Sequence, residues 1–179
     1  RLKELIWEFR ECFQQDLNPA GAARFPPVHL ELKKGAVPVR SYPYPTSPEQ
    51  KEQEWSYLQK MLEAQVIERK RSTWASPFLL VKKANTDQLR PVVNFTKLND
   101  NLKYEIYAIP RVTDVFQELA GSKWFSVLDV TSGFWNLPLD ESSKELCGIS
   151  THFGSYVYRA LPMGLHLSTS IFEEAMEET

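Results

Sequence analysis

One carboxylate in this chain stands where a strand is expected to end. Asp129 follows the apolar run Trp124–Leu128, and Gly133 marks a turn shortly after it. This pattern predicts a strand over Lys123–Asp129, whose last side chain lies at a sheet edge and faces a cleft. A carboxylate in that place could hold a cation. The alternative is a plain turn residue, which is the commoner role of a single Asp after a strand.

Cationic side chains gather upstream, on the arms of a predicted hairpin. The runs Phe78–Val81 and Pro91–Phe95 are rich in β-formers and flank a polar turn. The arms carry three cations: Lys82, Lys83 and Arg90. These side chains could bind a polyanion, or they could be edge charges that keep sheets from associating.

The formal charge of −2 conceals an uneven distribution. Residues 1–59 carry 8 basic and 8 acidic side chains, residues 60–103 carry 9 and 4, and residues 104–179 carry 4 and 11. A basic middle beside an acidic end predicts a polyanion surface next to a site for cations. The alternative is solvated charge on two faces. The composition itself excludes a disordered acidic tail and a histone-like basic protein.

The elements that must position these residues follow from periodicity. Leu2–Phe13 has helical spacing, and the proline-rich segment from Phe25 to Pro48 is expected to run extended, as a linker or a strap. Ser47, Pro48 and Gln50 form the start of a capped helix. The stripe that this helix is expected to bury consists of Trp55, Leu58, Leu62 and Val66.

The second half of the chain predicts an α+β fold. A helix after Pro110 is expected to turn four apolar side chains inward: Val112, Val115, Phe116 and Leu119. Strands are expected near Leu146–Ser150 and Tyr156–Leu161, followed by a last helix. Helices and hairpins alternate in this order without an internal repeat, which indicates an α+β arrangement of 179 residues with a sizeable core.

Several classes of protein are excluded or disfavoured. No run approaches 18 apolar residues, so no membrane partner or span is expected, and no leader peptide is recognised. Two cysteines, Cys12 and Cys147, cannot form a disulfide framework, which indicates a reducing compartment. An intracellular location, cytoplasmic or nuclear, is therefore expected. The histidines lack metal-ligand spacing, so no zinc site is expected. An Arg at position 1 and an uncapped last helix suggest a piece of a longer chain.

Three motifs in order resemble the reverse transcriptase of retroviruses and gypsy-type long-terminal-repeat retrotransposons, over roughly residues 28–179. The first resembles the fingers, the second the palm strand with the first catalytic aspartate, and the third the motif beneath template and nucleotide. They are Trp74–Lys83 with Leu89–Phe95 and Leu98-Asn99, then Phe125–Phe134, then Leu161–Leu165 with Ile171-Phe172.

The resemblance implies a right-hand polymerase fold, with fingers and a partial palm truncated before the catalytic Asp-Asp hairpin. The implied divisions are a connector helix over residues 1–24, a proline-rich strap over 25–47, fingers over 48–122 and partial palm over 123–179. It also implies template-primer of RNA or DNA and deoxynucleotide as partners. A protein partner could supply or replace the missing palm and thumb.

The resemblance assigns roles to single residues. Asp129 and the Val130 carbonyl would ligate Mg²⁺, which takes oxygen ligands and in pairs drives nucleotidyl transfer. Five further residues are assigned to the nucleotide: Lys83 and Arg90 to the triphosphate, Phe134 to exclusion of a 2′-hydroxyl, and Met163 and Gly164 to the floor beneath the base. Nucleic-acid contacts are expected from Lys82, Ser76, Pro77 and Ser168. One aspartate cannot hold two ions, so this stretch alone is expected to be inactive and not to bind Mg²⁺ stably.

The sequence departs from the family pattern, and these departures allow a second interpretation. Asn94-Phe95-Thr96 stands where the family has Asp-Tyr-Arg or Asp-Phe-Arg, and Glu173 stands where it has Gln. The chain is therefore either a piece of a retroelement RNA-directed DNA polymerase or a domesticated or decayed copy. Such a copy would serve as a structural or binding subunit of a larger assembly.

Overall fold

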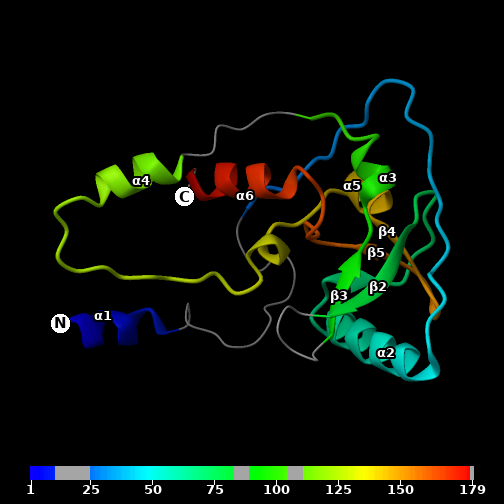
Figure 1. The fold of residues 1–179 in the computed structure, drawn as a ribbon, viewed down its shortest axis with the longest axis horizontal. Helices are drawn as coiled ribbons and strands as arrows, with labels where there is room; N and C mark the ends of the chain where they lie inside the picture. Colours follow the sequence, from blue (N-terminus) through cyan, green and yellow to red (C-terminus); the bar gives the residue numbers. More distant parts are fainter. Residues whose placement is uncertain (11–24, 83–88, 105–110, 178–179) are drawn as a thin grey trace.

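The computed structural model describes residues 1–10, 25–82, 89–104 and 111–177. Figure 1 shows a sheet with helices around it, and a separate arm that carries α4 away from the sheet. The elements are α1 Leu2–Glu8, α2 Pro48–Glu63, β1 Ile67–Glu68, β2 Ser76–Lys82, β3 Leu89–Val93, α3 Thr96–Asn99, α4 Val112–Glu118, η2 Gly133–Asn136, α5 Glu141–Leu146, β4 Gly148–Thr151, β5 Gly154–Tyr158 and α6 Ser168–Glu177. This content confirms the predicted α+β class; the division into four segments stays a prediction.

Within the described residues, the sheet has five strands in the order β1-β5-β4-β2-β3. β2 and β3 form the predicted antiparallel hairpin, β4 and β5 form a second one, and β2 joins β4 in parallel. Gly148 allows the parallel junction, because a Cβ there would collide with the carbonyl oxygen of Trp74. The two hairpins therefore make one continuous sheet.

The core lies between the sheet, α2 and the loops that cross it. Its largest fully buried side chains are Tyr156, Phe78, Phe95, Leu58, Ile67, Leu98, Leu102, Leu137, Ile149, Leu161, Val66 and Val157. Burying each of these side chains contributes about 1.5–3 kcal/mol relative to exposure. The thiol of Cys147 is also buried, and burial raises its pKa, so it is a poor nucleophile.

Helix α2 begins where the sequence predicts. The Ser47 hydroxyl accepts from the Gln50 amide N–H at 3.2 Å, and the Gln50 side chain accepts from the Ser47 N–H at 3.1 Å, which completes the capping box. Leu58 is buried as expected. Trp55 is not: its side chain is 38% exposed and stacks on Phe153 with ring centroids 4.9 Å apart.

A buried acid joins α2 to the turn between β4 and β5. Glu54 is 3% exposed. Its carboxylate accepts from the backbone N–H of His152 at 3.1 Å and lies 2.7 Å from Nδ1 of the same residue. Two hydrogen bonds from one partner satisfy the carboxylate, which would otherwise be costly to bury.

The proline-rich segment runs extended beside the sheet, as its composition predicts (Figure 1). It makes single bridges to three distant places: Val28 to Leu139, Leu32 to Leu102, and Arg40 to Ala75. These contacts hold residues 25–46 across the body of the molecule.

The strap is anchored to α5 through the N-cap residue of that helix. Burial acts to raise the pKa of the Asp140 carboxyl, but hydrogen bonds from Ser143, His29 and Ser142 outweigh it and hold the pKa well below its ordinary value. His29 Nδ1 lies 2.6 Å from this carboxylate, and the Asp140 N–H donates to the Val28 carbonyl at 3.0 Å. One side chain thus caps a helix and holds the strap.

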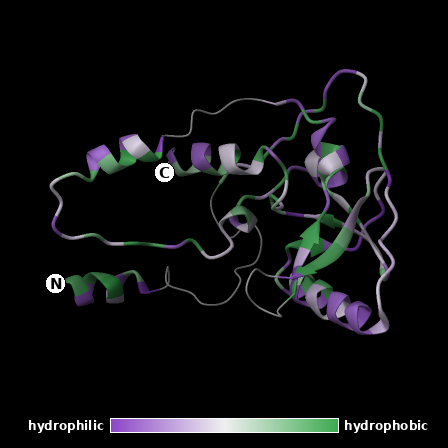
Figure 2. Ribbon diagram, viewed as in Figure 1, coloured by the Kyte–Doolittle hydropathy of each residue, from purple (hydrophilic) through white to green (hydrophobic). Residues whose placement is uncertain are grey.

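The predicted strand over Lys123–Asp129 is wrong. These residues form no strand, and Val127 and Leu128 are 91% and 80% exposed. A strand needs a neighbour to take its backbone hydrogen bonds, and no described residue pairs with this run. Figure 2 shows green apolar stretches along this arm, away from the sheet.

The two outlying helices also differ from expectation. α4 forms at the predicted place, but Val112, Val115, Phe116 and Leu119 are exposed rather than inward. The described part of α1 ends at Glu8, and its apolar side chains are exposed as well. Both helices have the right periodicity, yet within the described residues neither has a surface to pack on.

Candidate nucleic-acid interface

The hairpin of β2 and β3 turns its cations to opposite faces. Val81 pairs with Arg90, and the next pair is Lys82 with Leu89. Because successive side chains of a strand point to opposite faces and paired residues share a face, Arg90 and Lys82 lie on different sides. The predicted single basic surface is therefore two surfaces; Lys83 lies outside the described residues.

A pocket opens on the Arg90 side, where the strap crosses β2 and the start of α3. Its volume is about 440 Å³. We call it the strap pocket; its lining is Arg40, Ser41, Tyr42, Tyr44, Pro77, Asn94, Thr96 and Lys97. Two cations and two tyrosines line this space, and none of the acidic side chains in the described part of the chain does.

Backbone contacts fix the strap beside the strand. The Ser41 N–H donates to the Ala75 carbonyl at 2.8 Å, and the Ala75 N–H donates to the Val39 carbonyl at 2.9 Å. The Ser150 hydroxyl donates to the Ser41 carbonyl at 2.7 Å. Ser76, one of the predicted contacts, is itself buried, whereas Pro77 lines the pocket.

Asn94 organises the polar wall of the strap pocket. Its amide Nδ2 donates to the Tyr44 hydroxyl at 3.2 Å, and its Oδ1 accepts from the Thr96 hydroxyl at 2.7 Å and from the Thr96 N–H at 3.1 Å. The Asn94-Phe95-Thr96 departure therefore forms a neutral hydrogen-bonded corner. Tyr42 is 90% exposed, so one aromatic face remains open to a ligand.

Four residues of the strap pocket were not predicted from the sequence: Arg40, Tyr42, Tyr44 and Lys97. The repeated Tyr-Pro pairs at Tyr42-Pro43 and Tyr44-Pro45 were the available signal, because proline stiffens the backbone that presents each aromatic ring. Lys97 carried no such signal. It reaches the pocket only because α3 begins immediately beyond β3.

The loop before α6 is held by α3. Asn99 Nδ2 donates to the Gly164 carbonyl at 3.0 Å, and its Oδ1 accepts from the His166 N–H at 3.1 Å. Gly164 has φ of +98°, a conformation that other residues rarely adopt. Met163 is exposed beside it, while the buried Ser168 hydroxyl donates to the Pro162 carbonyl at 2.7 Å.

His166 adds a titratable group to this loop. Its ring lies 5.2 Å from that of Tyr104. Burial, together with nearby Lys33, lowers the pKa of the imidazole, and Asp100 opposes them. The ring is therefore neutral over a wider pH range than an exposed histidine.

Asp129 and Val130 lie at the end of the exposed arm, and Phe134 lies where the arm returns to the body. Phe134 is partly buried and meets Phe172 of α6 edge to face, with ring centroids 5.4 Å apart. A Cβ at Gly133 would lie 2.9 Å from the Phe172 ring, so the glycine allows α6 to approach. The aromatic pair is in place, but the arm before it is not part of the sheet.

The described residues do not make a complete Mg²⁺ site. No group of three or more Asp, Glu, His or Cys side chains in that part of the chain is placed to hold a metal ion. Asp129 is exposed, and no other carboxylate joins it in such a group. Within the same residues, no helix has the length and apolar character to cross a membrane.

The fold is that of the fingers and palm region of retroviral reverse transcriptases. Prototype foamy virus protease-reverse transcriptase matches 99% of the chain with a TM-score of 0.81 and 22% identity. The foamy viral enzyme in complex with an RNA/DNA hybrid matches 99% with a TM-score of 0.85 and 20% identity. In each case the chain covers 24% of the solved protein.

Relatives in sequence agree with this fold. The Pol polyprotein of transposon 412 from Drosophila melanogaster is 30% identical over 98% of this chain, and the Gag-Pol polyprotein of gibbon ape leukemia virus is 33% identical over 87%. The chain spans 15% and 10% of these proteins. The family model for reverse transcriptase (RNA-dependent DNA polymerase) matches residues 81–179. The chain belongs to the reverse transcriptase family.

Proposed function

We propose that this chain forms the template-binding front part of a retroelement RNA-directed DNA polymerase, and that the strap pocket holds an unpaired nucleic-acid strand. The pocket carries the proposal. Exposed aromatic rings beside a cationic groove are how proteins bind single strands, because bases stack on the rings and cations attract phosphates. Tyr42 and Tyr44 supply the rings, and Arg40 and Lys97 supply the charge.

The wider context supports the same proposal. A solved protein of the same fold, the foamy viral protease-reverse transcriptase, forms a complex with an RNA/DNA hybrid and complexes with double-stranded DNA. Asn94 and Thr96 offer a neutral polar wall, and within residues 1–10, 25–82, 89–104 and 111–177 no acidic side chain lines the pocket to repel a phosphate. A template-primer and deoxynucleotide are the proposed partners of the intact protein.

The chemical step belongs to the intact protein in this proposal. Asp129 would be one Mg²⁺ ligand contributed by this chain, with further carboxylates supplied from elsewhere, because the described residues do not complete a site. Primer extension with a longer parent protein separates the polymerase from the non-catalytic copy. Incorporation of deoxynucleotides that follows the template, requires Mg²⁺ and is lost in Asp129→Asn supports the polymerase. Absence of incorporation supports the non-catalytic copy.

Binding of a fluorescent single-stranded oligonucleotide tests the strap pocket directly. Tyr42→Ala is expected to weaken binding by about 1–3 kcal/mol, the range for one base stacked on an aromatic ring. Lys97→Gln is expected to weaken it and to reduce the salt dependence by about 0.7 in log–log slope, one phosphate contact. Lys34→Gln is the matched control, since Lys34 is exposed on the strap and outside the pocket. Equal effects of Lys97→Gln and Lys34→Gln would refute the assignment.

A further inference from the structure

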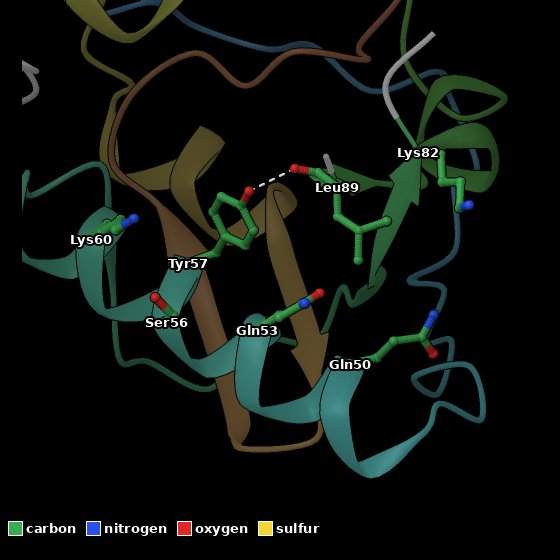
Figure 3. Close-up of a pocket in the computed structure, with 7 residues that line it drawn as sticks. All are labelled: Gln50, Gln53, Ser56, Tyr57, Lys60, Lys82 and Leu89. Atoms are coloured by element: carbon green, nitrogen blue, oxygen red, sulfur yellow. Dashed lines mark hydrogen bonds between the residues drawn. The ribbon is translucent and has the colours of Figure 1, made fainter. Parts of the chain in front are cut away.

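A second groove lies on the other side of the hairpin, between β2, β3 and α2. Its volume is about 640 Å³. We call it the α2 groove; its lining is Gln50, Gln53, Ser56, Tyr57, Lys60, Lys82 and Leu89. Lys82 and Leu89 are a cross-strand pair, so the groove lies on the face opposite to Arg90. Figure 3 shows the polar side chains following one another along the helix.

The charges of α2 are segregated around this groove. The helix contains four glutamates: Glu49, Glu52, Glu54 and Glu63. None of them lines the groove, and among the residues that the structure describes its charged side chains are Lys60 and Lys82. Glu54 is turned into the core, where it is bound to His152. The helix therefore presents a neutral-to-cationic side to the hairpin although its own net charge is negative.

The groove is long, and contacts of Tyr57 tie its two sides together. Gln50 and Lys60 are ten residues apart on one helix, a rise of about 15 Å. The Tyr57 hydroxyl donates to the Leu89 carbonyl at 2.6 Å, which ties α2 to β3 (Figure 3). The Lys60 ammonium lies 5.7 Å from the centre of the Tyr57 ring, so the ring also orients this cation.

We propose that the α2 groove is a second contact for single-stranded nucleic acid, in which lysines bind phosphates and neutral amides bind phosphate oxygens or base edges. A helical strand carries one phosphate per about 3.4 Å, so the groove spans roughly four of them. Gln side chains both donate and accept, which suits bases as well as phosphates. The volume is in the range of about 300–1,000 Å³ that holds a small ligand.

This inference goes beyond the proposed function, because it concerns the opposite face of the hairpin. A chain with both sites contacts a strand on either side of β2 and β3. The strap pocket offers exposed stacking rings, whereas the α2 groove offers amides and lysines. Binding in the groove is therefore expected to depend strongly on salt and weakly on base identity.

The test measures binding of the 179-residue chain to a labelled single-stranded oligonucleotide and to poly-glutamate of matched charge. Lys60→Gln is expected to weaken oligonucleotide binding roughly eightfold near 50 mM salt and to lower the log–log salt slope by about 0.7. Lys51→Gln is the matched control, because it removes the same charge from an exposed position of the same helix outside the groove.

A second pair of variants tests the amides. Gln53→Glu places a negative charge in the groove and is expected to weaken binding, whereas Gln59→Glu places the same charge on the same helix outside it. Equal effects within both pairs overturn the inference. An equal loss of poly-glutamate and oligonucleotide binding in Lys60→Gln overturns it too, since the groove would then be a general polyanion surface.

The two proposals fail in different ways. If Lys97→Gln weakens oligonucleotide binding while the groove variants match their controls, the strap pocket stands and the α2 groove does not. If the unaltered chain binds no oligonucleotide at low salt, both proposals are wrong.

Discussion

Removing the carboxylate of Glu54 is expected to destabilise the whole fold. The side chain is 3% exposed and accepts two hydrogen bonds from His152, one from the backbone and one from the ring. Hydrogen bonds to a charged group contribute about 1.5–3 kcal/mol each, and breaking a buried pair costs about 3–5 kcal/mol. Glu54→Ala is therefore expected to lower the free energy of unfolding by roughly 3–5 kcal/mol.

Urea unfolding followed by circular dichroism gives this quantity. The midpoint is expected to fall with little change in the denaturant slope, and Tm to fall by roughly 6–20 °C at about 2–4 °C per kcal/mol. Glu52→Ala is the control, because Glu52 is exposed on the same helix. His152→Ala completes a double-mutant cycle, in which we expect a coupling energy of about 1–3 kcal/mol. A Glu54→Ala protein as stable as Glu52→Ala, or a coupling energy near zero, would refute the reasoning.

Three further changes test other contacts. Because hydrogen bonds lower the pKa of Asp140, its contribution to stability is present above about pH 4 and is lost as the pH falls below that value. Asp140→Asn should therefore reduce the loss of stability at acid pH, and it removes the carboxylate that holds His29. Asn99→Ala should release the loop that it holds, which hydrogen exchange of that loop measures, while the β2–β3 hairpin stays protected. Gly148→Ala should cost more than about 4 kcal/mol or prevent folding, since the new Cβ meets the Trp74 carbonyl; a thermal melt close to that of the unaltered chain would contradict this.

Local signals predicted the local structure. The capping box of α2 is formed by residues within four positions of one another, so Ser47 and Gln50 were sufficient to place the helix start. The β2–β3 hairpin likewise follows from two short runs rich in β-formers. Side chains alternate between the two faces along those strands, so Lys82 and Arg90 lie on opposite faces. The prediction of one basic surface did not take this alternation into account.

Structure that depends on distant partners could not be predicted in this way. The run Trp124–Leu128 has the composition of a strand, but composition does not supply a neighbouring strand, and the run lies exposed. The strap pocket shows the converse. Arg40 and Tyr42 are far from Lys97 in the sequence and meet it because the strap crosses β2. Both the exposure of this run and the formation of the strap pocket depend on residues far away in the sequence, so local patterns do not predict them.

The bridges of the strap have a kinetic consequence. Val28, Leu32 and Arg40 each contact a segment far along the chain, so the strap cannot dock until those segments have folded. Contacts of such long sequence separation close late, since they pay the full entropy of the intervening loop. The bridge from Val28 to Leu139 spans more of the chain than any strand pairing of the sheet, so the start of the strap is expected to dock last. The bridge from Arg40 to Ala75, beside the strap pocket, spans less of the chain than the β2–β4 pairing. Oligonucleotide binding during refolding is therefore expected to appear before the last folding step.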